Sequence, residues 1–223
     1  MSPLDRPVWS ALHGAQAHLA VASGDAVRID PAYGPFAAAA PGAEDALAAV
    51  LRGPDDEIWL IETEAVAAPP GCRVVRVAPL VQLVSQGLVP ALGHDDIEPL
   101  GEGDAAEMAA LALANQPGPW GPATHHYGAF YGIRRDGALV AMAGERMRPA
   151  PGLAEVSGVC TDPAFRGQGM AARLIGHVMA GFAARGDTAY LHSWAGNVAA
   201  IRLYEQLGFQ IRRPMVATIL TRG

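Results

Sequence analysis

Apolar residues recur at helical spacing between positions 170 and 185, and unbroken apolar stretches flank them at 153–161 and 188–193. The spacing predicts a helix that ends at Gly186, with a buried face formed by Ala171, Leu174, Ile175, Val178, Met179 and Phe182. The flanking stretches predict strands. Because a strand, a helix and a second strand form a crossover connection, we expect these two strands to be parallel.

The pattern after residue 95 predicts further strands and helices around this unit. Asp136-Gly137 is a dipeptide typical of a hairpin turn. Strands are expected at 95–100, 129–134, 138–147, 209–212 and 215–220. Helices are expected from Asp104 to about Asn115 and from Asn197 through Gln206, because each starts at a side chain that can cap a helix.

Residues 1–94 predict a smaller α/β domain of unknown role. Its expected elements are a short helix near 9–13, a hairpin within 19–30, a helix at 44–51 and strands at 57–62 and 73–77. Glycines interrupt residues 83–94, and an acidic stretch follows. We therefore place a domain boundary between residues 94 and 95, so that the second domain is 95–223.

The composition favours a globular, cytoplasmic protein. Of the 223 residues, 51% are hydrophobic, which is enough for a sizeable core. The first residues carry no secretion signal, and no apolar stretch approaches the roughly 20 residues of a membrane helix. Cys72 and Cys160 are too few for a disulfide framework or a cysteine metal site, so we expect reduced thiols.

Charge is distributed unevenly along the chain. The net charge of −6 argues against nucleic-acid binding. Residues 128–223 hold 11 arginines against 6 acidic residues, a net charge of +5, whereas residues 1–127 hold 5 against 16, a net charge of −11. The basic part favours an anionic ligand, and the acidic part could attract a cationic amine.

A glycine-rich loop joins the strand at 153–161 to the helix that follows. Gly167 and Gly169 leave room for a phosphate at the first helical turn, where backbone N–H groups lack intrahelical partners. Arg166 can add a charged hydrogen bond. The loop therefore predicts a phosphate-bearing cofactor.

Two other cofactor classes use glycine-rich loops of this kind. The segment from Gly167 to Ala172 also fits the dinucleotide pattern G-x-G-x-x-G/A, but that site needs an acidic residue at the end of the next strand. Asp187 precedes that strand instead. A P-loop needs a lysine, and the chain contains none.

A second motif follows the loop about 30 residues later. The first is Arg166-Gly-Gln-Gly-Met-Ala171, which fits R/Q-x-x-G-x-G/A, and the second is Asn197-Val-Ala-Ala-Ile-Arg-Leu-Tyr-Glu-Gln-Leu-Gly-Phe209. Together they resemble the GNAT superfamily of acyl-CoA-dependent N-acetyltransferases over residues 95–221. The resemblance implies an α/β (α+β) fold with a mixed, mostly antiparallel sheet and flanking helices. The phrase at 155–161 also resembles a two-domain branch related to the glycine N-acyltransferase-like proteins.

The resemblance implies that acetyl-CoA is bound largely by the main chain. Loop amides would hold the pyrophosphate, and the backbone of Val159 and Thr161 would pair with the pantetheine like an added strand. Asn197 would bind the pantetheine or a water as well as capping its helix. The implied cofactor-binding residues are Val159, Thr161, Arg166, Gly167, Gln168, Gly169, Met170, Ala171, Asn197 and Tyr204.

Acetyl transfer needs a neutral amine, a stabilised oxyanion and a proton for the departing thiolate. The resemblance implies Tyr204 as the proton donor and Glu155 as the base, acting directly or through water. Glu145 and His192 are the next candidates for the base. A backbone N–H near Val159 is the implied oxyanion donor.

Two further features suggest chemistry that we do not expect. Cys160 could suggest covalent acyl transfer, but no histidine partner can be assigned to it. His125-His126 could suggest a metal, but adjacent side chains point in different directions on a helix or strand. We expect no metal site.

The expected function is transfer of an acetyl group from acetyl-CoA to a primary amine, by direct attack in a ternary complex without a metal. The acceptor is an unidentified small molecule or peptide. The alternative is a non-catalytic acyl-CoA-binding module whose N-terminal domain recognises a partner, and a dinucleotide oxidoreductase is a third possibility. We expect a monomer or homodimer that binds neither nucleic acid nor a membrane.

Overall fold

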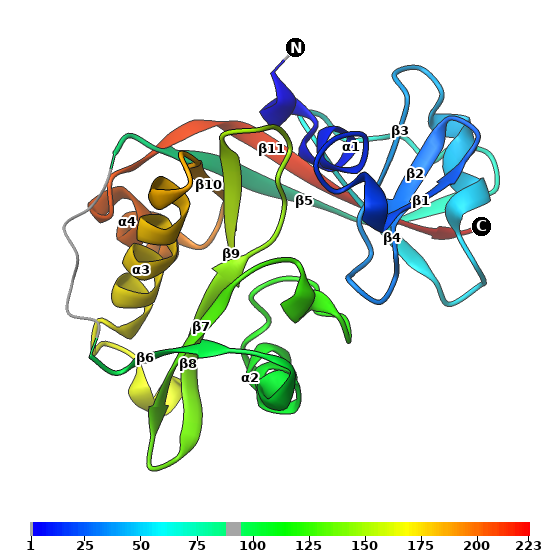
Figure 1. Ribbon diagram of the computed structural model, residues 1–223. Coiled ribbons are helices and arrows are strands. Elements are labelled where there is room, and N and C mark those ends of the chain that lie inside the picture. The colour runs from blue at the N-terminus through cyan, green and yellow to red at the C-terminus, as the bar shows by residue number, and fades with distance from the viewer. Residues whose placement is uncertain (1, 88–94) are drawn as a thin grey trace.

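The computed structural model describes residues 2–87 and 95–223. Figure 1 shows one long sheet, with α3 (Met170–Ala184) and α4 (Val198–Gln206) against one end and the N-terminal elements gathered beside the C-terminus at the other. No helix in the described part of the chain is long and apolar enough to cross a membrane. The predicted boundary after residue 94 borders residues 88–94, which lie outside the described residues.

The main sheet has eight strands and is mixed but mostly antiparallel, as predicted. In spatial order they are β4 (Glu57–Glu62), β11 (Phe209–Arg222), β5 (Cys72–Ser85), β10 (Thr188–Trp194), β9 (Leu153–Thr161), β8 (Ala138–Glu145), β7 (Phe130–Arg135) and β6 (Ile97–Leu100). Among the strands of the main sheet that the structure describes, β9 and β10 are the one pair that is parallel, which confirms the predicted crossover. The Asp136-Gly137 hairpin is confirmed as well, with φ of 50° and 82° at its two turn residues.

Helix α3 (Met170–Ala184) packs its apolar stripe on the sheet and forms the largest core. Five of the six predicted stripe residues are buried there: Leu174, Ile175, Val178, Met179 and Phe182. Helix α4 (Val198–Gln206) adds Leu203 and Tyr204 at the edge of the same core. Helix α2 (Ala105–Asn115) packs on β8 and β9 in a separate cluster that includes Met142 and Cys160.

The N-terminal segment starts with α1 (Pro7–Leu12) and a three-stranded sheet of β1 (Ala20–Ser23), β2 (Ala26–Ile29) and β3 (Ala37–Ala39). The predicted hairpin within 19–30 is confirmed as β1–β2. Phe36 bridges to Trp59 of β4, which attaches this small sheet to the main one. Short 3-10 turns occur at Pro3–Asp5, Ala17–Leu19, Glu44–Val50, Glu102–Asp104, Thr124–His126 and Pro163–Phe165.

Strand β5 is much longer than the predicted 73–77, and it lies between β10 and β11. The predicted strands at 209–212 and 215–220 are one strand, β11, which pairs with β5 along its whole length and has a register shift between Ile211 and Arg213. Pro214 is tolerated in β11 because β4 pairs only from Val216 onward. The predicted boundary therefore separates strands that share one sheet.

The predicted helix at 44–51 is confirmed as a 3-10 helix, Glu44–Val50. One local prediction needs correction. Asp104 does not cap α2 with its side chain, because its carboxylate accepts a hydrogen bond from the Gly101 N–H in the preceding turn. Glu107 binds Arg134 and the Leu139 N–H instead of completing a capping box.

Candidate active site

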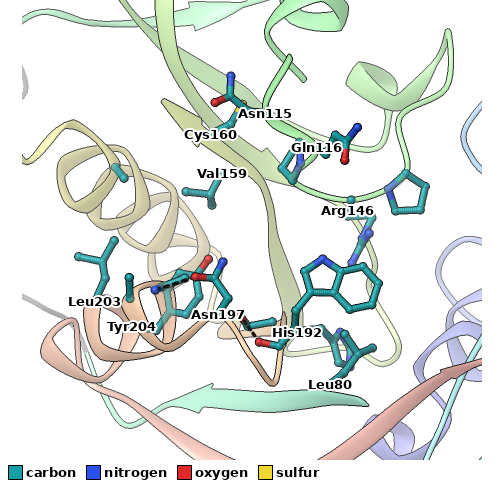
Figure 2. Close-up of a pocket in the computed structure, with 18 of the residues that line it drawn as sticks. Leu80, Asn115, Gln116, Arg146, Val159, Cys160, His192, Asn197, Leu203 and Tyr204 are labelled. Carbon is teal, nitrogen blue, oxygen red and sulfur yellow. Dashed lines mark hydrogen bonds between the residues drawn. The ribbon is translucent and has the colours of Figure 1, made fainter. Parts of the chain in front are cut away.

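A cavity opens where the two parallel strands separate. Strands β9 and β10 pair only from Leu153 to Glu155 and from Thr188 to Tyr190, so the later residues of β9 have no partner on the β10 side. The opening holds a cavity of about 530 Å³. Figure 2 shows Val159 between the α4 residues and the loop after α2. The unpaired edge of β9 thus leaves backbone groups available to a ligand.

A bulge in β9 sets which residues face this cavity. The pairing of β9 with β8 shifts register between Ser157 and Cys160, and Gly158 has φ of +63°. A Cβ at Gly158 would lie 2.8 Å from the Phe130 ring, so the bulge needs glycine. The simple alternation along β9 is broken, and Val159, Cys160 and Thr161 all line the cavity.

The glycine loop begins α3 without a side-chain cap. Gly169 occupies the N-cap position with φ of 75°, and Gly167 has φ of 76°. The first backbone N–H groups of α3 therefore have no intrahelical partner. Gly167 and Ala171 line the cavity, whereas Gln168, Gly169 and Met170 complete the loop without lining it.

Arg166 ties the loop to its neighbours. Its Nε donates to the Thr161 carbonyl at 3.2 Å, and its Nη2 donates to Asn115 Oδ1 at 2.8 Å. The Thr161 Oγ1 is buried without a hydrogen-bond partner among the described residues. This hydroxyl is free to accept or donate a hydrogen bond.

Asn197 and Tyr204 reach the cavity from α4. Asn197 caps the helix by accepting a hydrogen bond from the Ala200 N–H at 3.2 Å, which confirms the predicted cap. Burial raises the pKa of Tyr204 to about 12, so its hydroxyl is protonated at neutral pH. The ring packs at the edge of the core, and Figure 2 shows Tyr204 next to Asn197.

Glu155 is buried and does not line the cavity. Its carboxylate accepts two hydrogen bonds from Arg146, at 2.9 and 2.8 Å, and one from His192 Nδ1 at 2.8 Å. Burial alone would raise the pKa of Glu155, but the charge of Arg146 and the hydrogen bond from His192 outweigh it and hold the pKa well below its usual value. Arg146 and His192 do line the cavity.

The hydrogen bonds of Gln82 fix the tautomer of His192. Gln82 Oε1 accepts from Arg212, and Gln82 Nε2 donates to the Leu4 carbonyl, so the amide nitrogen is the group that faces His192 Nε2 at 3.0 Å. Because an amide nitrogen only donates, His192 Nε2 accepts and Nδ1 carries the proton given to Glu155. His192 therefore presents the lone pair of Nε2 to Gln82 and its Nδ1–H to Glu155.

Comparison with known proteins identifies the family. Over 113 residues the chain is 36% identical to the N-alpha-acetyltransferase RimI of Mycobacterium tuberculosis, an alignment that covers 47% of this chain and 70% of that protein. The crystal structure of an acetyltransferase from the GNAT family of Novosphingobium aromaticivorans matches 100% of both chains at 63% identity, with a TM-score of 0.97. The chain belongs to the GNAT family of N-acetyltransferases.

Two further matches concern part of the chain and its fold. Residues 130–217 match the family described as FR47-like protein. A GCN5-related N-acetyltransferase from Kribbella flavida shares the fold over 96% of this chain and 95% of its own, at 22% identity and a TM-score of 0.60. The match to the Novosphingobium structure includes the N-terminal segment, so that arrangement is shared by another GNAT protein.

Two other residues considered from the sequence, Glu145 and Cys160, do not provide a base or a nucleophile at the cavity. Glu145 is buried, bound to Arg148 and Arg185, and does not line the cavity. Cys160 lines the cavity, but burial raises the pKa of its thiol to about 12, so it is protonated at neutral pH.

His125 and His126 converge, contrary to the geometric argument made from the sequence. They lie on a 3-10 turn, and their Nε2 atoms are 2.9 and 3.0 Å from Glu102 Oε2. The expectation that adjacent histidines diverge holds for regular helices and strands but not for this turn. The group lies apart from the residues that line the cavity.

Sequence reasoning missed one side of the cavity. Residues of the N-terminal segment line it, namely Phe36, Trp59, Ile61 and Leu80, together with Arg146 and Trp194. None of these residues belongs to a motif, and their meeting depends on the pairing of β4 and β5 with distant strands. Apolar alternation in β4 and β5 was the only local signal.

Proposed function

We propose that this GNAT protein transfers an acetyl group from acetyl-CoA to a primary amine by direct attack in a ternary complex. The observation that carries the proposal is a single cavity that receives the uncapped start of α3, the unpaired edge of β9 and the Tyr204 side chain. These features correspond to an anion site, a site for an extended amide-bearing chain and a proton donor.

The residues present fit a CoA thioester. Backbone N–H groups of the loop from Arg166 to Ala171 would hold the pyrophosphate, and the β9 edge at Val159 and Thr161 would pair with the amides of the pantetheine. The unpartnered Thr161 Oγ1 fits a polar ligand on the same wall. Asn197 would add its amide. When bound, acetyl-CoA supplies the activated acetyl group.

Tyr204 would give its proton to the departing sulfur, because its raised pKa keeps the hydroxyl protonated. Glu155 is the proposed source of basicity, acting through water, because His192 lies between it and the cavity. Both ring nitrogens of His192 are already bound, to Glu155 and to the buried Gln82 amide. The negative charge of Glu155 would therefore stabilise the ammonium that forms on attack, and water would take its proton. No step of this proposal uses a metal.

Changing Tyr204 to Phe tests the chemical part of the proposal. We expect release of free thiol from acetyl-CoA, measured with an amine panel, to fall by about 100-fold in kcat, because a proton donor contributes factors of this size. The dissociation constant of acetyl-CoA should stay within about twofold. Equal turnover by Y204F and the unmutated protein would remove Tyr204 from the mechanism.

The oligomeric state, a monomer or homodimer, and the cytoplasmic location stay predictions. So does an acceptor that is a small molecule or a peptide amine. The first domain at 1–94 and the relation to the two-domain branch near the glycine N-acyltransferase-like proteins also stay predictions. Membership in the GNAT family favours the enzyme over the non-catalytic module and over the dinucleotide oxidoreductase.

A further inference from the structure

The cavity continues past the proposed CoA site into a part that we call the acceptor chamber. It is walled by Phe36, Trp59, Ile61, Leu80, Arg146 and Trp194. Figure 2 shows Arg146, His192 and Leu80 grouped on the side of the cavity away from Leu203. Four of the six wall residues come from the N-terminal segment, so that segment shapes the space in which an acceptor would sit.

Half of the six wall residues of the chamber are aromatic. The rings of Trp59 and Trp194 lie with centroids 6.1 Å apart at an interplanar angle of 57°, which places two indoles at an angle to one another. Phe36 is buried, and Arg146 lies over its ring at 4.7 Å. The backbone bond from the Trp59 N–H to the Pro35 carbonyl, at 2.8 Å, fixes Trp59 beside Phe36. Aromatic walls of this kind favour a flat apolar ligand.

The lining offers no counter-ion for a cationic ligand. Among the described residues, the cavity lining contains no Asp or Glu. The charge of Arg146 is balanced by Glu155, which binds it through two hydrogen bonds and is itself buried. Although residues 1–127 carry a net charge of −11, none of their Asp or Glu residues lines the cavity. A polyamine would lose hydration here without gaining an ion pair.

We propose that the acceptor is a primary amine that carries an aromatic ring, with the ring packed against the wall formed by Phe36, Trp59 and Trp194. This inference rests on the proposed function and names its substrate class. The same walls promote the reaction, because an apolar site without carboxylates disfavours the ammonium form and favours the neutral amine that attacks the thioester.

The test compares amines that differ in one property. Free-thiol release from acetyl-CoA is measured with 2-phenylethylamine, its saturated analogue 2-cyclohexylethylamine, and putrescine. We expect kcat/KM for phenylethylamine to exceed that for putrescine by at least about 10-fold, and that for cyclohexylethylamine by a few-fold, because ring contacts add to area burial. A preference for putrescine, or no turnover of the aromatic amine, overturns the inference.

Two matched variants locate the effect in the chamber. Trp59→Leu should raise KM for phenylethylamine by about 5- to 10-fold, because it removes one ring and keeps an apolar side chain. Trp9→Leu makes the same change outside the cavity and should leave KM unchanged. Equal KM values for the two variants overturn the inference.

Calorimetry of acetyl-CoA binding distinguishes failure of the proposed acceptor class from failure of the proposed function. Acetyl-CoA binding together with turnover of non-aromatic amines in preference to aromatic ones overturns only the substrate class. Absence of acetyl-CoA binding overturns the proposed function as well.

Discussion

Glu155 is hydrogen-bonded to two residues that line the cavity, Arg146 and His192. It holds the Arg146 guanidinium and the Nδ1–H of His192 at once, and almost none of its surface is exposed. Removing one member of such a group leaves a buried charge without its partner, which costs more than the pair itself contributes. The stability of the protein and the orientation of His192 should therefore depend on the same carboxylate.

Glu155→Gln should lower the free energy of unfolding by about 3 kcal/mol at pH 7, because Arg146 stays buried without an anion. The pKa of Glu155 is depressed in the folded protein, so its contribution is fully present above its ordinary value of 4.5 and is lost as the pH falls towards 2. Urea unfolding across that range should show a weaker pH dependence in the variant. Identical pH slopes would contradict this account.

At the scale of elements, the bulge in β9 separates the cavity-lining residues from the paired part of the strand. Gly158 allows it through a positive φ and through close contact with Phe130. Without this bulge, Val159 and Thr161 would follow the alternation of Glu155 instead of lining the cavity with Cys160 between them. The bulge thus links a backbone conformation to the shape of the site.

Gly158→Ala should destabilise the protein by about 2 kcal/mol, because the new Cβ meets the Phe130 ring and φ is unfavourable. Thermal unfolding measures the effect. The control is Gly181→Ala, a helical position with open space around it, which should be neutral or stabilising by up to about 1 kcal/mol. If both variants unfold at the same temperature, the bulge does not require glycine.

Elements with strong local signals could be predicted from the sequence. The Asp136-Gly137 hairpin and the strand, loop and helix around Gly169 are confirmed. The length of β5 could not be predicted, because Pro79 disfavours a strand interior. In the structure, β10 begins to pair with β5 at Leu80, one residue after this proline. The same holds for the candidate site. Sequence motifs predicted the position of its glycine loop, but the contacts of Arg146 depend on strand pairings between distant segments.

At the scale of the whole molecule, the N-terminal segment is part of the sheet that bears the site. Strand β5 pairs with β10 on one side and with β11 on the other. Gln82 of β5 contacts His192, and Leu80 lines the cavity. Neither the sheet nor the cavity is complete without residues that precede the predicted boundary.

A fragment of residues 95–223 should therefore fail to fold cooperatively. It would expose the facing edges of β10 and β11 and the apolar surface that β5 covers. Circular dichroism during urea unfolding checks this, with the full chain as the control. A sharp transition in the fragment would show that the GNAT part is an independent domain.

We propose that the start of α3 binds the phosphates of acetyl-CoA. Isothermal titration calorimetry of the full chain measures it most directly, with Gly169→Glu as the test variant and Gly181→Glu as the control that adds the same charge farther along the same helix. We expect acetyl-CoA to bind the unmutated protein and the control. We expect binding to be lost in G169E, where a bulky anion faces the open N–H groups. No binding to the unmutated protein, or equal binding to all three, would contradict it.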